Sequence, residues 1–102
     1  MPIEFEWDEN KRDETLRSRR VDILYAAGIF EGDVTTSIDR RSDYGEVRLI
    51  SVGMVEDECF VVVHTQRGHV TRLITAWKGG RNARRKYQAC FPGRADQDEE
   101  GR

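Results

Sequence analysis

The sequence predicts an α+β domain with two N-terminal helices, an antiparallel meander of about four strands and one C-terminal helix. Three observations support this prediction. Apolar residues before residue 32 recur at helical spacing, β-branched residues dominate residues 47–77 between short turn signals, and a glycine pair precedes a polar segment with helical spacing. With 102 residues, the chain can bury one small core, so we expect a single domain over residues 1–91.

The first elements are short and polar. Apolar residues alternate with glutamates over residues 3–7, which predicts a half-exposed strand. Asp8 follows as the N-cap of a helix that runs to about Ser18, in which Leu16 is the main apolar contact.

A second, more apolar helix is expected directly afterwards. Val21 and Asp22 have the character of a hydrophobic residue followed by an N-cap. Apolar residues then recur at helical spacing up to Phe30, and Gly32 supplies a stop signal. Two helices therefore precede the main sheet.

The meander is predicted from β-branched runs separated by turns. The expected strands are residues 34–39, 47–55, 59–65 and 70–77. Gly68 stands in the tight connection before the last strand, where a positive φ is needed. Gly79 and Gly80 end that strand, and residues 81–89 form the last helix.

Charge is unevenly distributed along the chain. The whole sequence has 17 basic and 19 acidic residues, for a net charge of −2. Without residues 95–102 it would have 16 basic and 15 acidic residues, so the body of the protein is nearly neutral. We expect residues 92–102 to form an acidic, disordered tail, because proline, glycine and charged residues dominate this segment.

Composition also narrows the classes of protein. No window approaches the length of an apolar membrane span, and the N-terminus lacks the features of a signal peptide, so we predict a cytoplasmic protein. The two histidines and two cysteines have no spacing typical of metal ligands, so we expect neither a metal site nor a cofactor. Cys59 and Cys90 are expected to be buried thiols.

The most informative segment is residues 77–87. It carries Lys78, Arg81, Arg84, Arg85 and Lys86 without any acidic residue. Such a cluster on one helix is suited to a polyphosphate chain, although a solvated helix face is the alternative.

The order of motifs resembles the BrnT family of toxins. The resemblance rests on FEWDENK (5–11), DRRSDYGE (39–46), VVVHTQRG (61–68) and RLITAWK (72–78), and continues to Tyr87. Leu16, Arg17 and Gly53 also match. It implies a RelE-like fold and a ribonuclease of a type II toxin–antitoxin system, held inactive by a BrnA antitoxin. It also implies two toxins with two antitoxins, and DNA binding only through the antitoxin.

Three positions depart from the family pattern. Arg19 stands where a histidine is usual, Trp77 where an arginine is usual, and Ala83 where a glutamate is common in the last helix. A catalytically degenerate toxin, which binds antitoxin or RNA without cleaving, is therefore the alternative to an active ribonuclease.

Metal-free RNA cleavage needs a base for the 2′-hydroxyl, an acid for the leaving oxygen and cations for the transition state. We predict catalytic roles for Glu46, His64, Lys78 and Arg81. Each has a structural alternative: an ion pair with Arg48 for the glutamate, core packing for the histidine and solvated charge for the two cations.

RNA contacts are predicted for a second set of residues: Arg67, Arg84, Arg85 and Tyr87. The tyrosine could stack on a base, or pack the last helix onto the sheet. Trp77 is expected on the same strand face as Leu73, as either a stacking platform or a core residue. A further basic cluster has three interpretations: the other wall of an RNA groove, a docking surface for an acidic segment of the antitoxin, or solvated helix charge. Its members are Lys11, Arg12, Arg17, Arg19 and Arg20.

Overall fold

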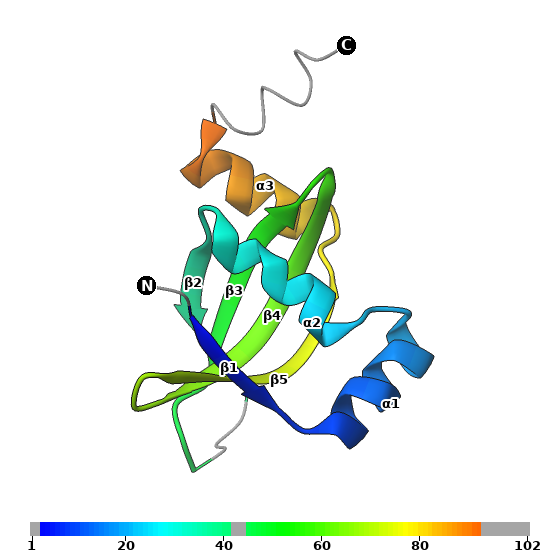
Figure 1. Cartoon of the computed structure of the whole chain (residues 1–102). Helices are drawn as coiled ribbons and strands as arrows, with labels where there is room; N and C mark the ends of the chain where they lie inside the picture. The colour runs from blue at the N-terminus through cyan, green and yellow to red at the C-terminus, as the bar shows by residue number, and fades with distance from the viewer. Residues whose placement is uncertain (1–2, 42–44, 93–102) are drawn as a thin grey trace.

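The computed structural model of the chain describes residues 3–41 and 45–92 and confirms the α+β class (Figure 1). Its elements, in order, are β1 (Glu4–Trp7), α1 (Glu9–Arg19), α2 (Ile23–Ala26), the 3-10 helix η1 (Ala27–Glu31), β2 (Thr35–Ile38), β3 (Leu49–Val55), β4 (Glu58–Arg67), β5 (Val70–Lys78) and α3 (Arg81–Cys90). Most of the predicted acidic tail (residues 93–102) and part of the predicted turn at 40–45 (residues 42–44) lie outside the described residues.

The five strands form one mixed sheet in the order β1-β5-β4-β3-β2. Strands β2 to β5 make the predicted antiparallel meander. The predicted strand over residues 3–7 is also present, but the sequence did not predict its partner: β1 pairs in parallel with β5, with Glu4 opposite Val70, so the sheet is mixed. Alternation in the sequence identifies a strand but not its partner, and this pairing joins segments more than 60 residues apart.

Helix α2 and η1 cover one face of the sheet, whereas α1 lies beside the sheet and contacts β5 and α2 (Figure 1). The core on this side combines buried residues of α2 and η1 with residues of β4 and β5: Val21, Ile23, Ala26, Ala27, Ile29, Phe60, Val62, Leu73 and Ala76. The second predicted helix is divided, because four α-helical residues continue as η1. Gly28 lies at this change, where an added Cβ would lie 3.2 Å from Val55 Cγ2, so η1 packs closely on β3.

Helix α3 packs on the opposite face over a smaller core. Its buried members are Val52, Cys59, Val61 and Tyr87. Trp77 packs at the edge of this cluster and not with Leu73, so the predicted shared face was wrong. The cause is a bulge: Val63 pairs with Thr75 and His64 with Leu73, which leaves Ile74 without a partner residue on β4. One additional residue reverses the alternation that follows it.

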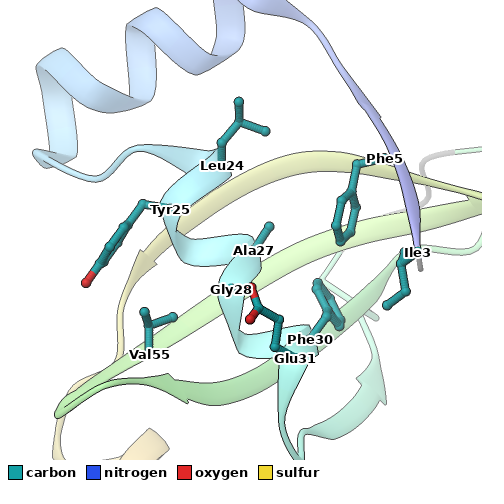
Figure 2. A pocket seen from close by; sticks show the side chains of 9 residues that line it. All are labelled: Ile3, Phe5, Leu24, Tyr25, Ala27, Gly28, Phe30, Glu31 and Val55. Atoms are coloured by element: carbon teal, nitrogen blue, oxygen red, sulfur yellow. The ribbon is translucent and has the colours of Figure 1, made fainter. Parts of the chain in front are cut away.

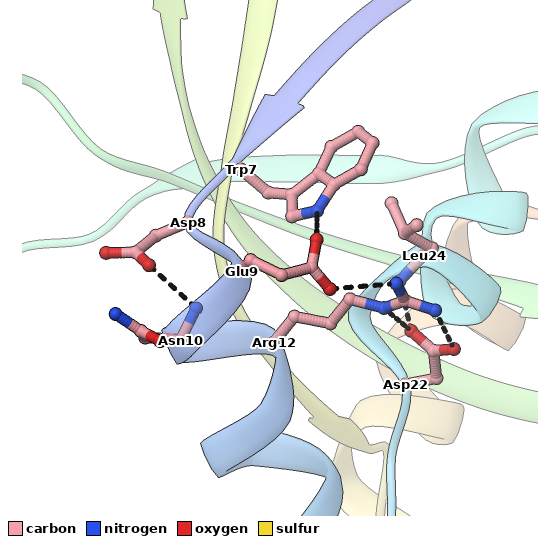
Figure 3. A network of polar contacts seen from close by, with 7 residues as sticks. All are labelled: Trp7, Asp8, Glu9, Asn10, Arg12, Asp22 and Leu24. Atoms are coloured by element: carbon pink, nitrogen blue, oxygen red, sulfur yellow. Dashed lines mark hydrogen bonds and ion pairs between the residues drawn. The ribbon is translucent and has the colours of Figure 1, made fainter.

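Figure 3 shows how α1 and α2 are joined at their N-termini. The predicted caps are confirmed: Asp8 accepts from the Asn10 backbone N–H and Asp22 from that of Leu24, at 2.8 and 3.0 Å. Arg12 of α1 makes a bidentate pair with Asp22, with both N–O distances 2.9 Å. This pair lowers the pKa of Asp22 and fixes α1 against the start of α2.

Two local expectations were wrong. Leu16 is 44% exposed, and Thr15 is the buried residue of α1 instead. Cys90 is exposed at the end of α3, whereas Cys59 is buried as expected. The Cys59 thiol lies so close to Gly79 that an added Cβ there would clash with Sγ, so a glycine is needed where β5 ends. Gly68 has the predicted positive φ, +61°.

Candidate active site: an arginine groove

A charged groove of about 410 Å³ lies where β4, β5 and the segment that leads into β3 meet the start of α1. We call it the arginine groove; it is lined by Asp8, Lys11, Glu46, Arg48, Arg67, Arg72, Leu73 and Ile74. Four of these residues are basic and two are acidic. The groove therefore presents a concentration of positive charge that the nearly neutral composition does not suggest.

Strand alternation puts the groove on the sheet face that α3 also uses. Phe5 and Leu73 point into the core under α2, so their strand neighbours Glu6 and Arg72 point to the other face. Thr65 of β4 pairs with Arg72 and lies on that face too. Helix α3 packs over the far part of the same face.

Glu46 is held among arginines. Its carboxylate oxygens lie 3.5 Å from Arg48 Nε and 3.7 Å from Arg67 Nη2. Arg67 and Arg72 in turn contact Glu6 Oε2, at 3.5 and 3.0 Å. The arrangement places a carboxylate, able to accept a proton, beside guanidinium groups, able to bind phosphate oxygens.

Two of the three departures from the family pattern touch each other. The Arg19 guanidinium carbon lies 5.2 Å from the centre of the Trp77 ring, and Arg19 Nη1 donates to the Ala76 carbonyl at 3.4 Å. Arg41 lies over the same ring at 5.4 Å and makes a bidentate pair with the buried Asp39. These cation–π contacts gather two further arginines on β5, three residues from Ile74 of the groove.

His64 lies outside the groove. It is buried under η1, with its ring edge-on to Phe30 at a centroid distance of 5.1 Å. Nε2 is 2.7 Å from Ser51 Oγ, which is in turn 2.8 Å from Thr36 Oγ1. Nδ1 has no hydrogen-bond partner among residues 3–41 and 45–92, and burial lowers the pKa of this histidine. The geometry matches the packing alternative.

Lys78 lies on the opposite face from the groove. It follows Trp77, and its side chain lines a small pocket with Tyr25 and Phe60 under α2. Its ammonium is 3.4 Å from Glu58 Oε2. Lys78 pairs with Phe60, and Arg67 stands seven positions farther along β4, so roughly 23 Å of strand lies between Phe60 and Arg67.

The predicted site residues of α3 lie apart from both the groove and Lys78. Arg81 and Arg85 are exposed, and Arg84 Nη1 donates to the Asp57 carbonyl at 3.4 Å. Tyr87 is only 2% exposed, with its ring 5.0 Å from that of Phe91, which matches the packing alternative rather than base stacking.

The structure thus brings together Glu46 and Arg67 of the predicted site, and separates them from His64, Lys78 and Arg81. Arg72 and Glu6 were not predicted as site residues. Arg48 was predicted only as an ion-pair partner of Glu46. The signal that could have found Arg72 is alternation, since it stands between the core positions Thr71 and Leu73 within the RLITAWK motif.

The described part of the chain has neither a metal-binding cluster nor a membrane-spanning helix. Residues 3–41 and 45–92 contain no group of three or more histidine, cysteine, aspartate or glutamate side chains placed to hold a metal ion. Within the same residues, no helix has the length and apolar character needed to span a membrane.

Comparison with known families gives one match. Residues 7–86, most of the chain, match the family described as "Ribonuclease toxin, BrnT, of type II toxin-antitoxin system". The match begins at the end of β1 and ends within α3, so it includes all residues of the arginine groove. No curated protein matches the chain. The extent of the family match shows that this chain belongs to the BrnT ribonuclease toxins of type II toxin–antitoxin systems.

Proposed function

We propose that this toxin cleaves RNA in the arginine groove without a metal ion. The cleavage inhibits translation and growth in the cytoplasm, and a BrnA-like antitoxin neutralises the toxin. Two toxins assemble with two antitoxins, and DNA is contacted through the antitoxin alone. The observation that carries the proposal is the carboxylate of Glu46, which lies within 4 Å of two guanidinium groups in an open groove.

The chemistry follows from these groups. Glu46 accepts the proton of an RNA 2′-hydroxyl, and the resulting oxygen attacks the adjacent phosphorus. The bond to the 5′-oxygen breaks, and that oxygen takes a proton from water, leaving a 2′,3′-cyclic phosphate and a 5′-hydroxyl end. Arg67 and Arg72 stabilise the additional negative charge on the phosphate during this transfer, since cations that are already in position need not rearrange as that charge develops.

Other cations extend the RNA path beyond the groove. Arg19 and Arg41 on Trp77 provide planar surfaces for a base and charges for phosphate, and Arg81 and Arg85 continue the positive surface along α3. His64 supports the groove indirectly, because it packs β4 against η1 through Phe30.

A catalytically degenerate toxin is the second candidate. The observation that favours it is that Glu6 contacts both Arg67 and Arg72, so part of the positive charge in the groove is already neutralised. Such a protein would bind RNA or antitoxin but leave RNA intact.

The test is cleavage of purified RNA in excess EDTA. We expect the parent protein to cleave, and Glu46→Gln to lose activity by a factor of about 10² to 10⁴, the usual contribution of general base catalysis. Arg67→Ala should reduce the cleavage rate by a similar factor, because it removes a cation that stabilises the transition state. The combined Lys78→Ala and Arg81→Ala variant should need more RNA for half-maximal rate while its maximal rate changes little.

Asp13→Asn is the matched control, because it also exchanges a carboxylate for an amide but lies on α1 outside the groove. If the Lys78 and Arg81 variant loses all activity while Glu46→Gln cleaves like the parent, the reaction centre lies near α3 and the groove assignment is wrong. A folded parent that binds RNA without cleaving it would establish the degenerate toxin.

A further inference from the structure

An apolar pocket of about 710 Å³ lies on the face of the molecule opposite the arginine groove (Figure 2). Its walls are aromatic and aliphatic side chains from β1, α2, η1 and the end of β3, chiefly Ile3, Phe5, Leu24, Tyr25, Phe30 and Val55. Figure 2 shows Ile3, Phe5 and Phe30 gathered at one end and Tyr25 with Val55 at the other. The two phenylalanine rings lie 5.8 Å apart.

The pocket is open, and two of the large side chains that line it are exposed. Ile3 at one end of the pocket and Tyr25 at the other are each 45% exposed, and the apolar lining of the pocket connects them. Contiguous exposed apolar surface of this kind marks interaction sites.

The rim of the pocket is acidic. Among the described residues that line it, Glu31 alone is charged, and Glu56 accepts a hydrogen bond from the Tyr25 hydroxyl at 3.1 Å. Glu31 and Glu56 form no ion pair with any described residue. By contrast, Glu4 and Glu6 of β1 and the acidic residues within α1 each contact a basic side chain. These carboxylates leave negative charge available to a partner.

We propose that this pocket is the docking site for an amphipathic helix of the antitoxin, with an apolar stripe that enters the pocket and lysine or arginine residues along its edges. Apolar residues at positions i, i+3, i+4 and i+7 of a helix form a stripe that fits a groove of this kind. The basic edges then face Glu31 and Glu56, and charge complementarity selects the partner and its orientation.

The identity of the partner as the antitoxin rests on the proposed function, whereas the docking site itself rests on the pocket. The pocket shares no lining residue with the arginine groove. Docking and RNA cleavage therefore depend on different residues and can be lost separately.

The probe is a fluorescent 15-residue peptide with leucines at i, i+3, i+4 and i+7 and lysines at the flanking positions. We expect it to bind the full-length parent protein, and Ile3→Glu and Glu31→Lys each to weaken binding at least about tenfold. A peptide with glutamates in place of the lysines should bind at least about tenfold more weakly than the lysine peptide.

Ile38→Glu is the matched control, because Ile38 is 48% exposed, similar to Ile3, but lies at the end of β2 outside the pocket. Circular dichroism confirms that each variant is folded, and the same preparations are assayed for RNA cleavage. Cleavage should be equal in the pocket variants and the parent. If the parent does not cleave RNA but still binds the peptide as expected, the proposed function fails while the docking site stands.

Three results would overturn the docking site. One is equal peptide affinity in the parent, Ile3→Glu and Glu31→Lys. Another is an equal loss of affinity in Ile38→Glu. The third is a parent dimer in analytical ultracentrifugation that Ile3→Glu abolishes, without binding of the peptide, because this would assign the pocket to a second copy of the chain.

Discussion

The two faces of the sheet differ in both packing and charge. The face under α2 and η1 has a core of nine buried residues and an open apolar pocket with an acidic rim. The face shared by α3 and the arginine groove has a core of four buried residues, and its remaining surface carries ion-paired arginines. One sheet therefore separates an apolar interaction surface from a cationic one, because successive residues of a strand point to opposite faces.

The largest expected effects concern the two cores. We expect Ile29→Ala to lower the free energy of unfolding by about 2–5 kcal/mol and to destabilise the whole domain. Tyr87→Ala should weaken the packing of α3 on the sheet by about 3–5 kcal/mol. The loss of hydrogen-exchange protection should be concentrated in that helix. Urea unfolding and hydrogen exchange measure the two effects.

Tyr87→Phe is the control, because it keeps the ring and removes one hydroxyl. A uniform loss of protection in both alanine variants would contradict the idea that the smaller core holds α3 as a separate unit.

An intermediate effect is expected from His64, which belongs to the face under η1. Burial lowers the pKa of His64 in the folded protein. As pH falls, the unfolded chain therefore binds a proton at this residue near pH 6.5, whereas the folded protein binds it only at lower pH. The stabilising contribution is therefore complete above about pH 6.5 and is lost as pH falls toward the folded-state pKa, by at most about 1.4 kcal/mol per pH unit.

Unfolding of the parent and His64→Gln at pH 7.5 and pH 5.0 tests this. The variant should lose less stability over that range than the parent. His69 is exposed and present in both proteins, so it does not affect the difference. Equal losses would show that His64 can be protonated in the folded protein.

The smallest expected effect concerns the charge balance of the groove. Glu6→Gln removes the carboxylate that competes with phosphate for Arg67 and Arg72. We expect RNA to bind about two to five times more tightly, because a partly exposed ion pair contributes at most about 1 kcal/mol. The gain should decrease as salt is added.

Fluorescence anisotropy with labelled RNA measures the change, and Glu9→Gln on α1 is the matched control outside the groove. If both variants bind RNA equally tightly, Glu6 does not restrict the groove.

Local rules correctly predicted most of the secondary structure. Side chains that bind the backbone two residues ahead set the starts of α1 and α2, so Asp8 and Asp22 could be identified without knowledge of the fold. The same holds for Gly68, because a positive φ is a property of a single residue. The candidate site was only half predictable: Glu46 and Arg67 were named, but their grouping with Arg48 and Arg72 was not.

By itself, the sequence determined the α+β class, the order of its elements and, through its motifs, membership of a toxin family. Only the tertiary structure decided that β1 joins β5 in parallel, that the bulge at Ile74 turns Trp77 away from Leu73, and that Lys78 and Glu46 lie on opposite faces. The physical reason is how far apart in the sequence the interacting residues stand. Caps and turns depend on neighbouring residues, whereas strand pairing and the face that a side chain occupies depend on contacts between distant segments.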